Sequence, residues 1–371
     1  MDRSILHDFH ETHGARFQLR NGTELVVDYG DALAEYRNLS DGAGLLDLSF
    51  RGRICLAGAD RVRFLHGQVT NDVKRLKVGE GCYAALVTAK GKMQSDLNIY
   101  CLAEELLLDF EPGLTARVIE RLEQFLVADD VQVVDVSPQY GLLSIQGPQA
   151  AAAVKQLGLF AELPANAFDI SKAEHPTLGE VYLARQPRLG GLGFDVFVPV
   201  SGLSAAAETL LAATRAVGGG LCGWTALEMA RIEAGIPRFG LDMDENFLLQ
   251  ECGIESRAVS YTKGCYIGQE VLNRLHTLGH VNRELRGLRL ADQLKALPLK
   301  GDKLFHDKRE VGFVTSVLRS PRWGANIALG YVRREMNQPG TQLTLLTSEG
   351  EGQARVLSLP FNLATPEASG T

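Results

Sequence analysis

The sequence predicts an α+β protein that ends in a small all-β barrel, and two stretches of the chain carry this prediction. Within residues 106–136, an amphipathic helix pattern lies between two strand-like segments. Beyond residue 283, short strand-like segments alternate with Gly and Pro, and no long helical pattern occurs. The chain has 371 residues, which is too long for one ordinary hydrophobic core. We therefore expect two or three domains.

The first stretch contains apolar side chains at helical spacing. They are Leu114, Val118, Leu122, Phe125 and Leu126. This spacing predicts an amphipathic helix over residues 113–127, flanked by strands at 106–110 and 131–136. Such a strand–helix–strand order is typical of helices packed on one side of a sheet. A further helix is expected over residues 224–234, because Gly235 is a helix-stopping residue.

The second stretch contains the clearest carboxy-terminal strands, at residues 286–290 and 312–316. Both are short, and each contains a glycine. Segments of this kind, with no intervening long helix, are typical of a small β-barrel.

Composition excludes several classes of protein. Lys and Arg number 38 against 45 Asp and Glu, so the formal net charge is −7, and a non-specific nucleic-acid binder would be basic. No apolar run has the length of a membrane span, and the amino terminus lacks the order of a secretory signal. The six cysteines contain no CxxC pair and are expected to be free thiols. We expect a cytoplasmic enzyme or binding protein with no direct nucleic-acid or membrane partner.

The densest group of reactive residues is Lys-Gly-Cys-Tyr-Ile-Gly-Gln-Glu at 263–270. Lys263 is two residues from Cys265, so its ammonium group can lower the pKa of the thiol and favour the nucleophilic thiolate. Glu270 can orient a base or accept a ligand amino group. The alternative is a strand–turn–helix junction in which the cysteine is only a small buried apolar residue. The residues alone leave both interpretations open.

Segments elsewhere extend this motif into a pattern that covers most of the chain. They lie at 44–49, 58–60, 64–65, 69–73, 146–150, 231–237, 312–316 and 359–361. Together with 263–270, they make the sequence resemble the YgfZ branch of the glycine-cleavage T-protein superfamily. The resemblance implies a three-lobed ring of two ferredoxin-like α+β domains plus a C-terminal β-barrel, around a channel that holds a folate.

The expected domain ranges follow from this resemblance. Residues 1–50 and 137–235 would form the first, folate-binding α+β domain. Residues 51–136 and 236–282 would form a second α+β domain carrying the 263–270 motif, and residues 283–371 would form the barrel.

The resemblance also implies tetrahydrofolate as the bound cofactor. Asp195 stands where the family commonly has Glu and would accept hydrogen bonds from the N–H-rich edge of the pterin. Arg231 matches an arginine that faces the folate site, where a guanidinium can bind a carboxylate of the glutamyl tail. Lys90, Gln269 and Glu270 complete the expected cofactor-binding set. The simpler alternatives are an edge-strand surface carboxylate for Asp195 and an intrahelical partner of Glu228 for Arg231.

The segment at 90–97, Lys-Gly-Lys-Met-Gln-Ser-Asp-Leu, separates two branches of the superfamily. True T-proteins carry a pair of adjacent aspartates here, whereas this chain has Ser95 followed by Asp96. General acid–base catalysis needs a titratable group, which serine is not. If the first aspartate is the essential one, aminomethyl transfer is lost; if Asp96 is, activity is retained. Lys90 and Lys92 either line the channel or are solvated lysines of a turn.

Three functions are therefore considered. The first is a YgfZ-like, tetrahydrofolate-binding protein that assists iron–sulfur cluster assembly or repair in client enzymes, with an indirect effect on tRNA modification. Cys265, Lys263 and Asp96 would be its reactive residues. The second is a folate-dependent aminomethyltransferase or methyltransferase, which the length of the chain favours. The third is a scaffold without folate chemistry.

No bound metal is expected. His276 and His280 are four residues apart, but Gly279 between them favours a turn over a continuous helix. Cys252 and Cys265 fall short of the four ligands of a stably bound iron–sulfur cluster.

Overall fold

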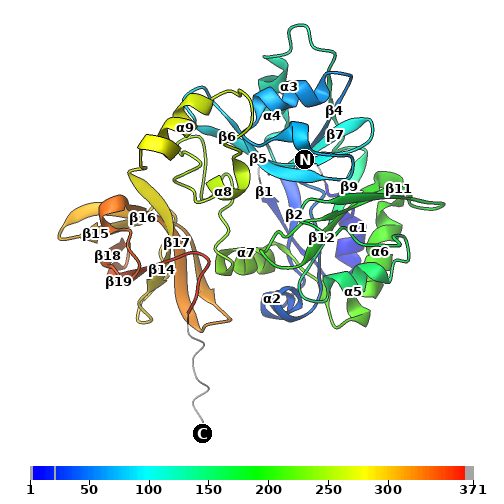
Figure 1. Cartoon of the computed structure of the whole chain (residues 1–371). Helices are drawn as coiled ribbons and strands as arrows, with labels where there is room; N and C mark the ends of the chain where they lie inside the picture. Colours follow the sequence, from blue (N-terminus) through cyan, green and yellow to red (C-terminus); the bar gives the residue numbers. More distant parts are fainter. Residues whose placement is uncertain (1–2, 21, 364–371) are drawn as a thin grey trace. The chain divides into compact units, whose positions relative to one another are not determined.

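The computed structural model describes residues 3–20 and 22–363 of the chain (Figure 1). Contacts divide it into two units. Unit 1 contains Met1–Val87, Ser95–Glu228 and Arg257–Ile267, and unit 2 contains Thr88–Gln94, Met229–Ser256 and Gly268–Thr371. Unit 1 holds two large sheets with their helices and a two-stranded hairpin, and unit 2 holds the closed barrel. The predicted α+β class with a carboxy-terminal barrel is confirmed.

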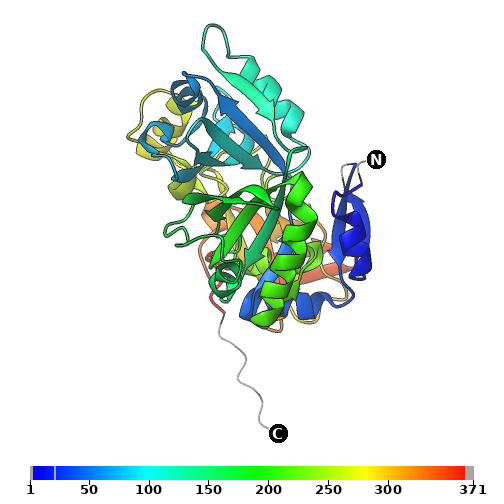
Figure 2. The same ribbon diagram turned by 90° about the vertical axis from the view of Figure 1, so that its right-hand side faces the viewer.

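The larger sheet of unit 1 has six strands in the order β10-β11-β12-β9-β3-β13. Its strands are β3 (Gly44–Asp47), β9 (Tyr140–Gln146), β10 (Ile170–His175), β11 (Gly179–Arg185), β12 (Gly193–Pro199) and β13 (Gly220–Leu221). The helices that contact it are α2 (Ala32–Asp41), α5 (Ala150–Lys155) and α6 (Val200–Ala216). Figure 2 shows α6, in green, lying along this sheet. Buried Leu203, Leu210 and Leu211 of α6 join the apolar core beneath it, as its alanine-rich, amphipathic sequence requires.

The smaller sheet has five strands in the order β5-β6-β7-β4-β8. Its strands are β4 (Gly52–Ala57), β5 (Gly81–Val87), β6 (Met93–Cys101), β7 (Glu105–Phe110) and β8 (Gln132–Asp135). The helices α3 (Arg61–Gln68) and α4 (Thr115–Glu123) pack on it, and the short turn η1 (Val73–Arg75) follows α3. The predicted strand–helix–strand order is thus confirmed.

Helix α4 is shorter than the predicted range 113–127. Val118 and Leu122 are buried in the core, but Phe125 is 39% exposed and Val127 is 91% exposed. The guanidinium of Arg121 covers the Phe125 ring at 4.3 Å. The apolar pattern therefore continues beyond the end of the helix at Glu123, where Phe125 and Val127 are exposed. The chain then turns towards β8.

The barrel of unit 2 is closed in the order β14-β17-β16-β15-β18-β19. Its strands are β14 (Arg283–Leu290), β15 (Lys303–His306), β16 (Arg309–Ser320), β17 (Ala325–Arg333), β18 (Gln342–Thr347) and β19 (Gly350–Leu357), with the 3₁₀ turn η2 (Arg334–Met336) after β17. Its core consists of inward-facing aliphatic side chains such as Leu288, Val314 and Leu345. Closure leaves no free sheet edge in the barrel.

The remaining elements are short. They are α1 (His7–Thr12), the hairpin β1 (Arg16–Arg20) and β2 (Thr23–Asp28), α7 (Trp224–Glu233), α8 (Glu255–Ala258) and α9 (Gln269–Leu278). The helix predicted over 224–234 is confirmed as α7. No helix among residues 3–20 and 22–363 is long and apolar enough to span a membrane.

Each sheet falls within one of the expected domains. The strands of the six-stranded sheet lie within residues 1–50 and 137–235, those of the five-stranded sheet within 51–136, and those of the barrel beyond 283. Segments 236–256 and 268–282, which we expected in the second α+β domain, belong by their contacts to unit 2 with the barrel. The exact boundaries remain a prediction.

Candidate active site

The two-residue repeat of strand β6 sorts its side chains onto two faces. Leu97 and Ile99 join the apolar core of the five-stranded sheet. Asp96, Asn98 and Tyr100 alternate with them and lie on the opposite face. Ser95 shares the face of Leu97, is fully buried, and donates its hydroxyl to the Asp96 carbonyl at 2.9 Å. A residue at position 95 is therefore directed away from the polar face that carries Asp96.

Asp96 is half-buried, and its carboxylate has spare hydrogen-bonding capacity. The Tyr83 hydroxyl donates to its Oδ2 atom at 2.8 Å. Its buried Oδ1 atom has no hydrogen-bond partner among the residues that the structure describes. Burial, and secondly the nearby Glu111 carboxylate, raise the pKa of Asp96 to about 6. A carboxyl group with this pKa exchanges a proton readily near neutral pH.

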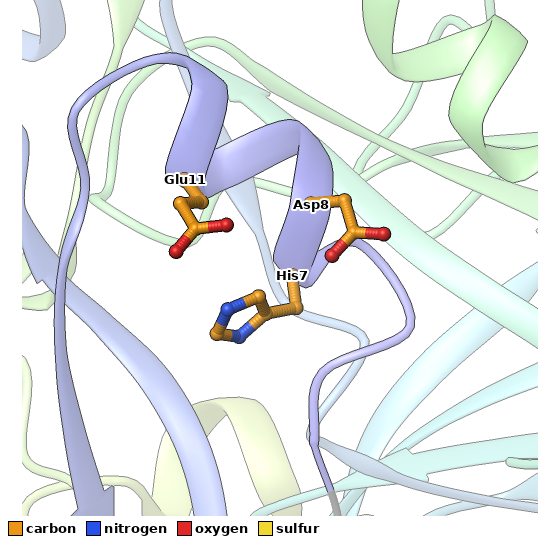
Figure 3. Close-up of side chains that lie close together, drawn as sticks. All are labelled: His7, Asp8 and Glu11. Atoms are coloured by element: carbon orange, nitrogen blue, oxygen red, sulfur yellow. The ribbon is translucent and has the colours of Figure 1, made fainter.

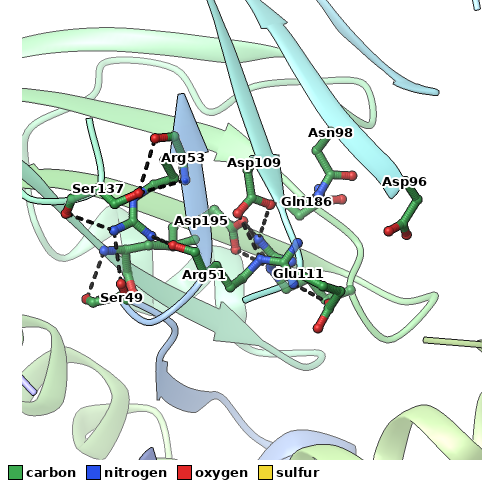
Figure 4. A network of polar contacts seen from close by, with 12 residues as sticks. Ser49, Arg51, Arg53, Asp96, Asn98, Asp109, Glu111, Ser137, Gln186 and Asp195 are labelled. Atoms are coloured by element: carbon green, nitrogen blue, oxygen red, sulfur yellow. Dashed lines mark hydrogen bonds and ion pairs between the residues drawn. The ribbon is translucent and has the colours of Figure 1, made fainter. Parts of the chain in front are cut away.

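Beside Asp96 on the same sheet, Asp109 of β7 is fully buried and fully paired. Its carboxylate accepts hydrogen bonds from Arg51 Nε at 2.8 Å and from Asn98 Nδ2 at 2.8 Å. Arg188 Nη2 donates to it at 3.0 Å. Burial alone would raise the pKa of Asp109, but the two guanidinium groups hold it well below its usual range. Figure 4 shows Asp109 between Arg51, Asn98 and Asp195.

The carboxylates of Asp96, Asp109, Glu111 and Asp195, with Arg51 and Arg188, are called the acidic cluster below. Arg51 pairs with Asp109 in this cluster. It also pairs with Glu111. Its neighbour in the sheet, Arg53, is buried and donates to the Arg51 carbonyl at 2.8 Å and to the Tyr140 carbonyl at 2.9 Å. Burial lowers the pKa of Arg53 to about 10. Arg53 therefore binds backbone from both sheets and positions Arg51.

Asp195 of β12 is fully buried in the same cluster, opposite Ser144 of β9 in the sheet register. Arg188 binds it as a fork: Nε lies 3.0 Å from each carboxylate oxygen, and Nη2 also donates to Oδ2. Burial raises the pKa of Asp195, and the Arg188 guanidinium opposes that rise. The alternative of an exposed carboxylate on an edge strand is wrong, because β12 lies between β11 and β9.

The 263–270 motif spans the end of unit 1 and the start of α9, and its lysine binds backbone carbonyls. Lys263 is buried, and its ammonium donates to the carbonyls of His66 and Val69 at 2.6 Å and of Asn71 at 2.9 Å. Burial lowers the pKa of Lys263 to about 8. Cys265 is exposed, so the alternative of a small buried cysteine is wrong. All three donors of Lys263 are used in closing this loop.

Gln269 and Glu270 form the first turn of α9, after Gly268, whose φ of 85° lies in the left-handed region. Glu270 is exposed, and Lys90 is exposed in the turn between β5 and β6. Their assignment to a cofactor remains a prediction.

Arg231 of α7 is buried among polar groups of unit 2. It donates to Asp242 Oδ2 at 2.6 Å and to Ser316 Oγ at 2.8 Å, and Asp242 in turn accepts from Thr315 at 2.6 Å. These contacts join α7 to strand β16 of the barrel. They favour a structural role for Arg231 over binding a glutamyl tail.

The two histidines weighed as metal ligands are not presented together. His276 binds Glu255 through Nδ1 at 3.0 Å, and His280 follows the end of α9 at Leu278. The group that best matches metal geometry in the described part of the chain is His7, Asp8 and Glu11 on α1, whose ligand atoms lie within 4.8 Å of one another (Figure 3). However, Nδ1 of His7 already binds Glu24 at 2.6 Å.

Sequence reasoning missed most of the cluster around Asp96. Asn98 and Tyr100 could have been found from the alternation that begins at Asp96. Asp109 could have been found as a lone carboxylate in the otherwise apolar run 106–110, where burial demands a partner. Arg51 and Arg188 carried no local signal, because their partners are distant in sequence.

The comparisons with known proteins agree with this architecture. Residues 6–263 match the family described as GCVT N-terminal domain, and residues 283–362 match the glycine cleavage T-protein C-terminal barrel domain. An aminomethyltransferase of Halalkalibacterium halodurans is 28% identical over 97% of this chain and 98% of its own length. One of Halothermothrix orenii is 28% identical over 97% of this chain and its full length.

A solved structure gives the same result. The crystal structure of the glycine cleavage system aminomethyltransferase T from Bartonella henselae superposes with a TM-score of 0.86, at 26% identity, over 97% of this chain and 98% of that one. These relatives do not support the narrower YgfZ assignment, which remains a prediction. With two family domains matched along most of its length, this chain belongs to the glycine cleavage T-protein family.

Proposed function

We propose that this protein is a folate-dependent aminomethyltransferase, which was the second of the functions considered from the sequence. It would move the one-carbon unit of an aminomethylated carrier, such as a lipoyl group, to tetrahydrofolate and release ammonia. Aminomethyltransferases of this family use tetrahydrofolate as the one-carbon carrier. The observation that carries the proposal is the buried, unpartnered Oδ1 atom of Asp96, on a carboxyl group whose pKa is raised to about 6.

The position of Ser95 supports the proposal, although the first aspartate of the T-protein pair is missing. Ser95 lies on the core side of β6, whereas Asp96 lies on the polar side with Asn98 and Tyr100. A carboxylate at position 95 would therefore not have joined the cluster. Asp96 is the residue of the pair that can serve as acid and base in this chain.

The residues of the cluster fit a reduced pterin. Oδ1 of Asp96 is a buried acceptor with no partner in the described part of the chain, and a pterin edge is rich in N–H donors. Asp195 has the right chemistry for the same kind of edge, but Arg188 occupies both of its oxygens in this structure. When bound, tetrahydrofolate supplies the two nitrogens that receive the one-carbon unit. Asp96 accepts a proton at Oδ1 and returns it to the departing amine, while Tyr83 holds Oδ2 in place.

The test is tetrahydrofolate-dependent release of ammonia from an aminomethylated lipoyl carrier protein. A known T-protein serves as the positive control, and reactions without tetrahydrofolate give the background. We expect ammonia release by the wild-type chain that requires tetrahydrofolate. Absence of release while the control turns over would contradict the proposal.

A YgfZ-like role in iron–sulfur cluster assembly is the second candidate, and the exposed thiol of Cys265 in the 263–270 motif favours it. In that role, client enzymes would be the partners, and the thiol would react with them. Complementation of a strain lacking the YgfZ protein separates the two candidates. Rescue by wild type but not by Cys265→Ser, together with no ammonia release, would favour the second candidate.

A further inference from the structure

Asp195 does not offer a free carboxylate. It is fully buried, and Arg188 occupies both of its oxygens with a forked guanidinium. A guanidinium presents two parallel N–H donors to a carboxylate. The pterin edge presents the same donor pattern. The two groups therefore require the same acceptor atoms and cannot bind Asp195 together.

The members of this pair differ in how firmly they are held. Asp195 lies within strand β12, between two neighbouring strands. Arg188 lies in the 186–192 connection between β11 and β12, which continues through exposed Gly190 and Gly191. The φ angle of Gly190 is 76°, which favours glycine and marks a tight turn. Connections of this kind change conformation more easily than strands do.

The rest of the cluster does not depend on Arg188. Asp109 keeps Arg51 and Asn98 as partners if Arg188 leaves. The Arg188 side chain is 11% exposed, so water is within its reach. Beside Asp195, Gln146 pairs with Gly193 in the sheet register and keeps its Oε1 atom unpartnered among the described residues. Departure of Arg188 therefore frees both carboxylate oxygens of Asp195 for a donor-rich ligand.

We propose that Arg188 is an intramolecular competitor of the pterin, a gate that closes the Asp195 subsite until a folate displaces it. This inference rests on the proposed function, because it assigns Asp195 to the pterin edge. The gate lowers the affinity for tetrahydrofolate and excludes ligands that lack a guanidine-like edge, since only such an edge can replace both hydrogen bonds of the fork.

Isothermal titration calorimetry with tetrahydrofolate under reducing, anaerobic conditions tests the gate without any turnover. We expect Arg188→Ala to bind tetrahydrofolate at least tenfold more tightly than wild type, with Arg188→Gln in between. The matched control is Arg185→Ala, because Arg185 lies in the preceding strand and donates to the Ala165 carbonyl. Its affinity should equal that of wild type. Thermal unfolding of each variant verifies that it is folded, and Arg188→Gln keeps the test open if the alanine variant is not.

Two further measurements test whether the gain in tetrahydrofolate affinity depends on the Asp195 carboxylate. In Arg188→Ala, low millimolar guanidinium chloride should refill the subsite and weaken tetrahydrofolate binding, with no such effect on wild type. In the Asp195→Asn background, Arg188→Ala should give no gain, because a double-mutant cycle reports the coupling between the two side chains.

The outcomes separate this inference from the proposed function. Equal affinity of wild type and Arg188→Ala, or weaker binding by the variant, would overturn the gate while the chain remains a folate-binding protein. No binding by wild type or by either folded Arg188 variant would overturn both.

Discussion

Two charged groups of unit 1, the buried Lys263 in the 263–270 motif and the half-buried Asp96 on strand β6, have opposite surroundings. The ammonium of Lys263 donates three hydrogen bonds, to the carbonyls of His66, Val69 and Asn71. The carboxyl group of Asp96 has one oxygen bound by Tyr83 and the other unpartnered among the described residues. A saturated charge stabilises a loop, whereas a charge with spare hydrogen-bonding capacity can act on a ligand. The more distinctive motif is therefore the weaker candidate for catalysis.

The strongest test of this contrast is Asp96→Asn. The variant keeps the shape of the side chain and an acceptor for Tyr83, but it cannot exchange a proton. We expect ammonia release to fall by about 100-fold or more, which is the usual contribution of general acid–base catalysis. Single-turnover kinetics measure the loss. Ser95→Ala, one residue away on the opposite face, is the control and should retain activity; a similar loss in both variants would show that the strand, and not the carboxyl group, was disturbed.

Arg231 provides the largest expected effect on stability. Arg231→Ala leaves Asp242 as a buried carboxylate without its cation, which costs about 3–5 kcal/mol in the free energy of unfolding. Urea denaturation measures this cost, with the exposed Arg319→Ala on β16 as control. The affinity of the folded variant for tetrahydrofolate should not change. Normal stability combined with weaker tetrahydrofolate binding would restore the ligand-facing role expected from the sequence.

Lys263→Met tests whether the fully hydrogen-bonded ammonium of Lys263 has only a structural role. The substitution keeps much of the side-chain volume but leaves three carbonyl acceptors without their donor. We expect the free energy of unfolding to fall by about 2–4 kcal/mol, while kcat for one-carbon transfer in the folded protein stays close to that of wild type. Lys155→Met, at an exposed position of α5, should leave both quantities unchanged. Loss of turnover with full stability would assign Lys263 to the chemistry instead.

The raised pKa of Asp96 also predicts a dependence of stability on pH. The pKa of this carboxyl group is about 6 in the folded protein, above its ordinary value of 3.8, so the folded state binds more protons between these values. Stability contributed by the protonated group is therefore present below about pH 4 and lost as the pH rises through about 6. Asp96→Asn should be about 1–3 kcal/mol more stable than wild type at pH 8, and this gain should disappear near pH 4. Urea denaturation at both pH values measures the difference; a constant offset would exclude a raised pKa.

The smallest expected effect belongs to Cys265. Because its thiol is exposed while Cys55, Cys101, Cys222 and Cys252 are buried, it should react first with a thiol reagent in the native protein. Cys265→Ser should remove this fast phase and leave both stability and ammonia release unchanged. A marked loss of ammonia release would give the thiol a part in the transfer reaction.

Local patterns in the sequence determined the architecture of this protein. Helical spacing predicted α4, and Gly235 predicted the end of α7, because both depend on residues within a few turns. The dense Gly and strand signals beyond residue 283 predicted the barrel. Asp96 and Asp195 were also identified as candidates from their segments, although their roles came from a family resemblance and still require the experiments above.

Only the tertiary structure decided which of these residues have capacity left for a ligand. Arg188 meets Asp109 across a separation of 79 residues, and Lys263 meets the Val69 carbonyl across 194. No local pattern encodes such pairs, because they form only when distant strands and loops pack together. Pairing determines whether a buried charge is saturated or available, since burial penalises each charge until a partner or a ligand satisfies it. The sequence alone therefore specified the fold and the candidate carboxylates. Long-range packing left one oxygen of Asp96 without a hydrogen-bond partner among the described residues, and it paired the carboxylate of Asp195 with Arg188.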